Sequence, residues 1–162
     1  LKTMMSDIFG DLREWGRVLN QIEQLKQAGK LDEHEEALGR VLRYRYNFEL
    51  RQCALRAVPD LTRPSRQILD ILLGIVADEY CQMETRLLAC EAASHAIAKN
   101  SGGPEEGEFE AAAARCAGEV LRVRQPPVLR NAVTRCLLAK RQAVDRGAQA
   151  PPRGAARRYA TS

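Results

Sequence analysis

Aromatic residues make up only 5% of this 162-residue chain, and no run of apolar residues is long enough to cross a membrane. A membrane-spanning helix needs about 20 mostly apolar residues. The N-terminus also lacks the apolar segment of a signal peptide. Because strands favour aromatic and β-branched residues, a chain poor in aromatics and rich in Ala, Leu, Arg and Glu favours helices. The composition therefore predicts an all-α protein without a membrane segment.

Sequence patterns for catalysis and metal binding are scarce as well. The chain has two histidines, His34 and His95, and they lie far apart in the sequence. It contains no Gly-rich phosphate loop and no Gly-x-Ser-x-Gly motif. The acidic cluster at 32–36 is interpreted as a solvated helix N-terminus, where carboxylates complement the helix dipole. An enzyme needs a positioned acid, base or nucleophile, so we expect a non-catalytic protein with no metal, no cofactor and no small-molecule substrate.

The cysteines form an odd set without any C-x-x-C pair. The five are Cys53, Cys81, Cys90, Cys116 and Cys136. Neither their spacing nor the supply of histidine fits a zinc site. Cysteine used as a small buried residue is typical of proteins in a reducing compartment. This usage predicts a cytoplasmic location, with nuclear or cytoskeletal association as alternatives.

Three stretches of the chain align without a gap when each begins at a glycine, namely Gly39, Gly74 and Gly118. Each has a Val two residues on, an Arg twelve residues on, and small apolar residues fifteen and eighteen residues on. The arginines are Arg51, Arg86 and Arg130, and the small residues are Ala54, Ala89, Val133, Ala57, Ala92 and Cys136. The units are offset by 35 and 44 residues, a length typical of stacked helical hairpins.

Apolar spacing and end signals predict where the helices lie. A first helix is expected over 5–27, with Trp15 on its buried stripe and Gly29 as its stop. Asp32 and Asn47 are expected to cap helices that reach 43 and 58. The second pair should open near Thr62, turn at 78–82 and end near 99, and the third should cover 105–123 and 128–146. The predicted organisation is a helical repeat domain over 1–146, with units of about 32–58, 62–99 and 104–146, and a disordered basic tail over 147–162.

The segments 49–58 and 84–93 each carry an Arg followed by small residues, and they resemble the second helix of HEAT and armadillo-type repeats. The resemblance implies a right-handed α-solenoid of about three helical hairpins with an N-terminal capping helix. It also implies a protein–protein interaction or scaffold module of a larger protein. Because the chain begins with Leu1, we expect a piece of a longer chain or a processed product. Small residues let helices approach to about 8–10 Å. The three repeat arginines are predicted to be struts between helices.

The turns inside the helix pairs are the predicted binding site. In a solenoid these turns align on one edge, and Tyr and Arg are the residues that often anchor interfaces. The candidate partner-binding residues are Arg43, Tyr44, Arg45, Tyr80, Arg122 and Arg124. This pattern predicts a protein partner with an acidic surface.

Charge along the chain supports two alternatives. Residues 111–162 contain 11 basic and 2 acidic side chains, whereas residues 51–110 contain 6 basic and 10 acidic ones. A basic C-terminal third suits a nucleic-acid-binding module, or else it only keeps the chain soluble. The other alternative is a TOG-like tubulin-binding array, because such arrays use the same edge with basic groups and an N-terminal Trp, which here would be Trp15.

Overall fold

The structure is a computed structural model, and it describes residues 7–139. Within these residues the chain forms seven α-helices and no strand. The helices are α1 (Trp15–Ala28), α2 (Glu35–Leu42), α3 (Phe48–Ala57), α4 (Arg66–Ala77), α5 (Met83–Lys99), α6 (Glu106–Arg122) and α7 (Pro127–Leu137). Two short 3-10 helices, η1 (Leu31–His34) and η2 (Val58–Asp60), lie in the connections. The prediction of an all-α fold is confirmed for this part of the chain.

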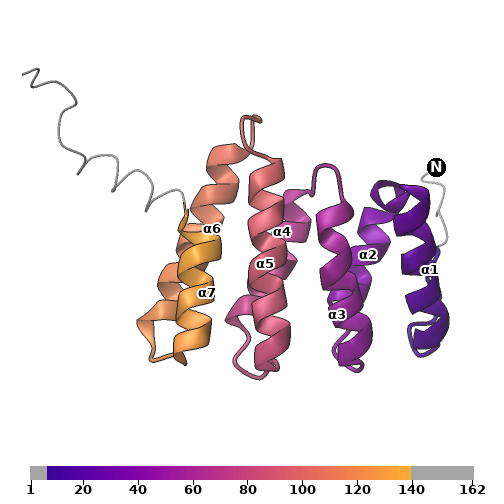
Figure 1. The fold of residues 1–162 in the computed structure, drawn as a ribbon, viewed down its shortest axis with the longest axis horizontal. Helices are drawn as coiled ribbons and strands as arrows, with labels where there is room; N and C mark the ends of the chain where they lie inside the picture. Colours follow the sequence, from indigo (N-terminus) through magenta and orange to yellow (C-terminus); the bar gives the residue numbers. More distant parts are fainter. Residues whose placement is uncertain (1–6, 140–162) are drawn as a thin grey trace, which may run out of the picture.

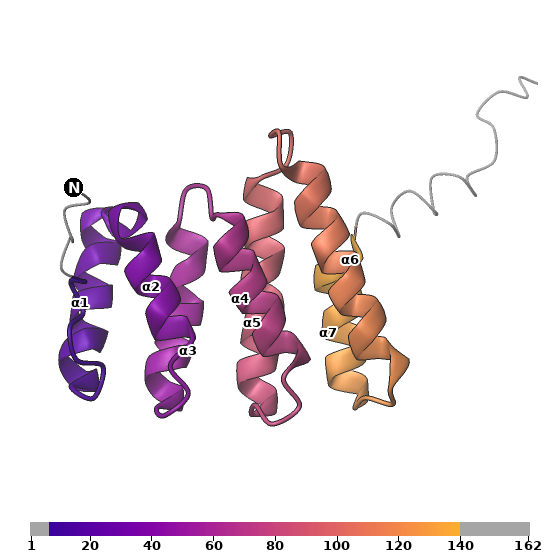
Figure 2. The ribbon, with the colours of Figure 1, turned by 180° about the vertical axis from the view of Figure 1, so that it is seen from behind.

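The helices form two layers (Figures 1 and 2). In one layer α1, α3, α5 and α7 lie side by side, and α2, α4 and α6 form the other. Each even-numbered helix packs against the odd-numbered helix that follows it, which gives the pairs α2–α3, α4–α5 and α6–α7. The turns inside the pairs therefore lie at one edge of the molecule, and the connections between pairs lie at the opposite edge.

Small residues of the repeat lie in the core, as predicted. Ala54, Ala89 and Val133 are fully buried, and Ala57, Ala92 and Cys136 are also buried. Two of the repeat glycines do not share this role. A Cβ at Gly39 would lie 3.3 Å from Ile71 Cδ1, so α2 approaches α4 closely there, whereas nothing lies within 4 Å of that position at Gly74 or Gly118. The idea that the glycines permit close packing is therefore right only at Gly39.

Two of the three repeat arginines connect paired helices, as predicted. Arg51 Nε donates to the Leu42 carbonyl oxygen at 2.8 Å, and Arg86 Nε donates to the Val76 carbonyl oxygen at 2.9 Å. Both side chains are buried. Each guanidinium thus satisfies a carbonyl at the C-terminal end of the preceding helix, where acceptors have no partner within the helix.

The prediction for the third arginine is wrong, because Arg130 is exposed. In its unit Gln125 Nε2 donates at 3.1 Å to the carbonyl oxygen of Val120, which occupies the same repeat position as Val76. Arg86 is near enough to the following pair for its charge to act on the Cys116 thiol. No further pair follows α7 in the described residues, so nothing there covers the corresponding arginine.

The N-terminal helix begins later than predicted. It starts at Trp15 rather than residue 5, and residues 7–14 form turns in which Gly10 has a φ of 57°. Phe9 is fully buried in these turns, and Arg17 Nη2 donates to its carbonyl oxygen at 2.7 Å. Trp15 is 44% exposed, so its prediction as a core residue is also wrong. Gly29, by contrast, ends α1 in the left-handed conformation that the sequence predicts.

Asp32 does not cap a helix. Its carboxylate accepts bonds from the Thr62 backbone N–H at 2.8 Å and from Thr62 Oγ1 at 2.7 Å, which ties two connections together. The helix α2 begins at Glu35, two residues after the start that a cap at Asp32 would give. The next pair also opens later than residue 62, because the Ser65 side chain caps α4 by accepting from the Ile68 N–H at 3.3 Å.

The other N-cap prediction is confirmed. Asn47 Oδ1 accepts from the Leu50 N–H at 3.0 Å, and α3 begins at Phe48. At the C-terminal end, α7 stops at Leu137. The predicted continuation to 146 and the predicted tail at 147–162 fall outside the described residues. None of the helices within 7–139 is both long and apolar enough to span a membrane.

Candidate protein-binding edge

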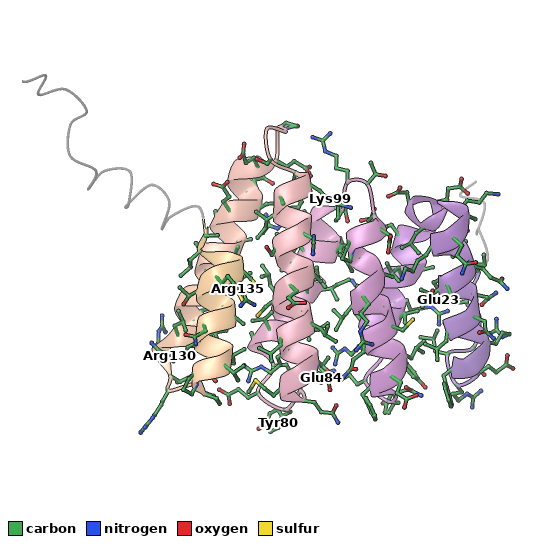
Figure 3. The ribbon with its side chains drawn as sticks, viewed as in Figure 1. Glu23, Tyr80, Glu84, Lys99, Arg130 and Arg135 are labelled. Atoms are coloured by element: carbon green, nitrogen blue, oxygen red, sulfur yellow. The ribbon has the colours of Figure 1, made fainter. Side chains whose placement is uncertain are left out.

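The turns inside the three pairs and the segment before α1 share one edge of the molecule (Figure 1). We name this surface the turn edge and define it as residues 10–15, 43–48, 78–84 and 122–128. Its central member is the α4–α5 turn, where Tyr80 projects outward and Glu84 lies nearby (Figure 3). The turn edge thus brings together segments whose starts are 33, 35 and 44 residues apart in the sequence.

Every large hydrophobic side chain that is exposed within residues 7–139 lies on the turn edge. These are Tyr80 (100% exposed), Tyr46 (89%), Phe48 (53%), Val128 (51%), Val123 (49%) and Trp15 (44%). Single exposed apolar residues are normal on any protein surface. Apolar side chains gathered on one surface among polar groups are instead typical of an interaction site.

The six predicted binding residues all belong to this edge, but they differ in exposure. Arg43, Arg45, Arg122 and Arg124 are exposed, as is Tyr80. Tyr44 is half-buried and packs against the core, with its ring edge-on to that of Tyr46 at a centroid distance of 5.5 Å. Tyr44 therefore supports Tyr46, whose ring is the one presented to solvent.

The six predicted residues leave out every exposed apolar side chain of the edge except Tyr80, and three of those left out lie at helix starts: Trp15, Phe48 and Val128. Trp15 and Phe48 are the first residues of their helices, and Val128 is the second residue of α7. The Cα–Cβ bond of a helical residue tilts towards the helix N-terminus. An apolar residue in the first turn therefore points beyond the helix end, and here that end lies at the turn edge. Helix-start position was the signal that could have identified all three.

Charge on the turn edge alternates in sign from one pair to the next. The α2–α3 turn carries Arg43 and Arg45, and the last pair carries Arg122 and Arg124. No ion pair involves any of these four guanidiniums within the described part of the chain. Between them, the α4–α5 segment carries three carboxylates, those of Asp78, Glu79 and Glu84.

The segment before α1 carries charges of both signs, and they are paired locally. Arg13 binds Asp11 with a shortest distance of 2.8 Å, and Arg17 Nε lies 2.7 Å from a Glu14 carboxylate oxygen. The hydrogen bond from Arg13 lowers the pKa of Asp11 to about 2, so this carboxylate is ionised at neutral pH. Segment 10–15 has one more carboxylate than guanidinium, and Arg17 of α1 neutralises the difference.

A hollow of about 540 Å³, lined by both polar and apolar residues, adjoins the edge between α2 and α4. Arg43 and Arg45 lie on its α2 side, and Ile71 forms part of its lining. On the α4 side Asp70 is held by Arg66 at 2.9 Å, and Asp78 accepts from the Tyr80 N–H at 3.0 Å. The two carboxylates are therefore engaged, while the arginines can receive an acidic group from outside.

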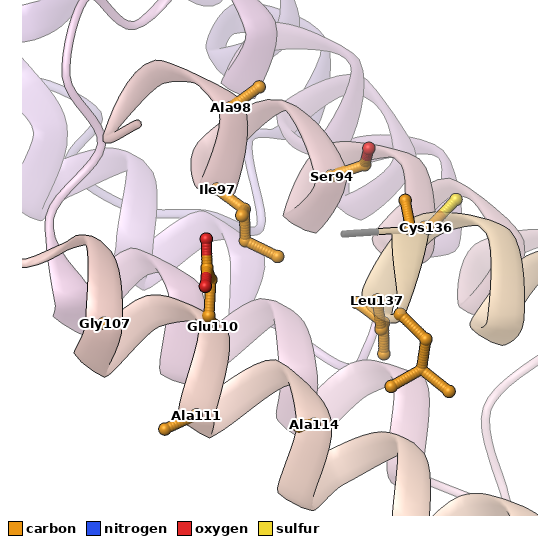
Figure 4. Close-up of a pocket in the computed structure, with 11 residues that line it drawn as sticks. Ser94, Ile97, Ala98, Gly107, Glu110, Ala111, Ala114, Cys136 and Leu137 are labelled. Atoms are coloured by element: carbon orange, nitrogen blue, oxygen red, sulfur yellow. The ribbon is translucent and has the colours of Figure 1, made fainter. Parts of the chain in front are cut away.

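A second hollow, of about 400 Å³, lies between α5, α6 and the end of α7 (Figure 4). Its lining is mostly apolar, including Ile97 and Leu137, with Ser94, Glu110 and Cys136 as its polar members. Burial raises the pKa of Cys136, which keeps its thiol protonated. The described lining contains no histidine or lysine that would act as a base. No cluster of metal-ligating side chains occurs within residues 7–139 either. The mostly apolar lining of this hollow suits an apolar group.

Comparison with known proteins does not assign the chain to a family. No protein-family model, curated protein or solved structure matches it. The candidate site is therefore defined by the exposure and charge of the turn edge itself.

Proposed function

We propose that the chain is a HEAT/armadillo-like module, a right-handed α-solenoid that binds other proteins without catalysing a reaction. Three helix pairs in two layers support this proposal, together with small core residues at fixed repeat positions. The guanidinium contacts of Arg51 and Arg86 recur in consecutive pairs, as expected of a repeat. The module would act as a scaffold within a larger protein in a reducing compartment such as the cytoplasm.

The turn edge is the proposed binding surface. The observation that carries the proposal is that all exposed large hydrophobic side chains of the described residues lie on this edge, among its charged side chains. Trp, Tyr and Arg are enriched among the residues that dominate binding energy at interfaces. Arg43, Arg45, Arg122 and Arg124 require acidic groups on the partner.

A pull-down from cell extract at two salt concentrations tests this function. The bait variant carries Arg43→Glu, Arg45→Glu, Arg122→Glu and Arg124→Glu, and it should lose the retained partner because like charges then face each other. Surface substitutions of this kind usually change stability by about 0.5 kcal/mol or less. A control variant with Lys30→Glu and Arg63→Glu reverses two exposed charges on the opposite edge, and it should retain the partner.

A second control removes residues 147–162, which contain Arg153, Arg157 and Arg158. If this deletion abolishes binding while the four reversals leave it intact, the turn edge is not the binding surface.

Two other candidates draw support from particular features of the chain. Arginines interleaved with exposed aromatic rings suit single-stranded nucleic acid, whose bases stack on such rings. The logarithm of the affinity for phosphates would fall linearly with the logarithm of salt concentration. The acidic α4–α5 segment would repel phosphates.

Exposed Trp15 favours the TOG-like tubulin-binding alternative. This candidate would be supported if the unmodified bait retains purified tubulin and the Trp15→Ala variant does not.

A further inference from the structure

The alternation of charge along the turn edge makes this edge complementary to itself. In chain order its four segments are 10–15, which is neutral when Arg17 of α1 is counted with it, then positive (43–48), negative (78–84) and positive (122–128). When two copies face each other with their segments in opposite order, the positive second segment of each copy meets the negative third segment of the other. The two outer segments meet each other, and the locally paired charges of segment 10–15 then face Arg122 and Arg124 without a repulsive excess of positive charge.

We infer that the turn edge binds the turn edge of a second copy of this chain, forming a two-fold dimer in which segment 43–48 of each copy faces segment 78–84 of the other. This inference rests on the proposed function because it uses the same surface, and it specifies the partner. A two-fold interface uses the same patch on both subunits, so self-complementarity is its basic requirement.

Two copies can face each other edge to edge with the two-fold axis in several positions, and the charges of the segments favour one of these positions. With the axis along the edge, each segment would meet its own copy, placing Arg43 and Arg45 against the same arginines. With the axis perpendicular to the edge, the segment order is reversed. Only when this axis passes between the α2–α3 and α4–α5 turns do all four segments find a counterpart without a facing pair of like charge. An axis between the second and third pairs would match only two segments.

The exposed apolar side chains supply the remaining surface for such a dimer. Tyr46 and Phe48 lie in the second segment, and Tyr80 in the third, so the reversed arrangement brings these rings together at the centre. Trp15 and the pair Val123 and Val128 lie in the outer segments, which also face each other. With helices spaced by about 8–10 Å, the four segments span roughly 30 Å. Apolar contacts are thus distributed along the whole edge.

The test is sedimentation equilibrium of the full 162-residue chain with two charge-reversal variants. The first carries Arg43→Glu and Arg45→Glu, and the second carries Glu79→Arg and Glu84→Arg. Asp78 is left unchanged because it accepts a bond from the Tyr80 N–H. Glu79 is exposed, and the one ion pair of Glu84 within residues 7–139 is with Arg56 at 4.0 Å, so its replacement disturbs little. The opposite-edge variant with Lys30→Glu and Arg63→Glu matches the net charge of the first variant.

We expect the unmodified chain and the opposite-edge control to dimerise. Each edge variant alone should dimerise at least ~100-fold more weakly, because its second and third segments then carry the same sign. An equimolar mixture of the two edge variants should recover the dimer, since one presents two negative segments and the other two positive ones. A monomeric unmodified chain at all concentrations, or a mixture without recovery, would overturn the inference. Recovery in a mixture of the second variant with Arg122→Glu/Arg124→Glu, but not with the first variant, would overturn the proposed axis.

The two proposals fail in distinguishable ways. A monomeric chain whose extract partner is lost on reversal of the four arginines disproves the dimer and keeps the protein-binding function. If the chain dimerises and the edge variants behave as expected above, the dimer is supported. If every edge variant also retains the extract partner, the turn edge does not bind that partner. Titration of the chain with a labelled oligo(dT) 20-mer tests nucleic-acid binding separately from these two proposals. If the unmodified chain is monomeric and binds the oligonucleotide tightly, and the first variant loses this binding, the dimer is overturned.

Discussion

A single residue type at one repeat position occurs in two different environments in this protein. Arg86 is 4% exposed, and its Nη2 is buried without a hydrogen-bond partner in the described residues. No described carboxylate pairs with its charge; the carbonyl end of α4 provides the compensating negative potential. Arg130 occupies the equivalent position but is exposed to solvent. The same substitution at these two positions should therefore have different effects on the free energy of unfolding.

We predict that Arg86→Ala lowers the free energy of unfolding by about 2–4 kcal/mol, because it leaves a cavity and an unsatisfied Val76 carbonyl. Arg130→Ala should change the free energy of unfolding by no more than about 0.5 kcal/mol. Urea unfolding followed by circular dichroism measures both values. Equal losses at the two positions would mean that burial does not set the role of the repeat arginine.

At the scale of elements, α5 is the helix most surrounded by others, since α3, α4, α6 and α7 all contact it. Its buried face consists largely of small residues, among them Ala89, Ala92, Ala93 and Ala96. Short side chains allow several helices to approach the same helix at once. The fit of α5 therefore depends on side-chain volume more than on apolar character.

Ala89→Leu should force α5 away from its neighbours and cost about 1–3 kcal/mol of stability. Ala98→Leu is the matched control on the same helix, because Ala98 is exposed at the rim of the 400 Å³ hollow. Thermal melts should show a lower Tm for the first variant and little change for the second. A Tm for Ala89→Leu equal to that of the unmodified chain would contradict the packing described for α5.

At the scale of the whole molecule, five free thiols report on the fold. Cys90, Cys116 and Cys136 are buried, whereas Cys53 and Cys81 are half-buried. Desolvation raises the pKa of Cys90 to about 12 and that of Cys116 to about 11, from an ordinary value of 9.0. Below pH 9 these thiols are protonated in both states, so their contribution to stability is fully present. Above pH 9 the unfolded chain loses their protons while the folded chain retains them, which favours unfolding.

The free energy of unfolding should therefore fall as pH rises from about 9 towards 11–12. Urea titrations at pH 8 and pH 10 measure the fall, and Cys90→Ala with Cys116→Ala should reduce it.

In the folded protein at pH 8, maleimide should label Cys53 and Cys81 well before the three buried thiols. Rapid labelling of Cys90 in native conditions would show that this part of the core opens readily.

Local chemistry allowed much of this fold to be predicted from the sequence. The three- and four-residue apolar spacing defines helices, and Asn47 and Gly29 act on backbone groups within a few residues. The burial of Ala54 and Ala89 followed from their fixed repeat positions. These features depend on neighbours along the chain, which the sequence specifies directly.

Tertiary structure alone decided what each side chain meets across the chain. Asp32 binds Thr62 in the next connection instead of capping a helix, and Arg130 is exposed because no described pair follows it. Trp15 has an apolar spacing but lies at the start of α1, where its side chain reaches the turn edge. The alternating charges of that edge belong to segments 35 and 44 residues apart, and stacking of the helix pairs places them in one line. Burial and exposure are set by contacts distant in sequence, so the sequence determined the helices and their core positions, and the packing of the pairs determined the surface.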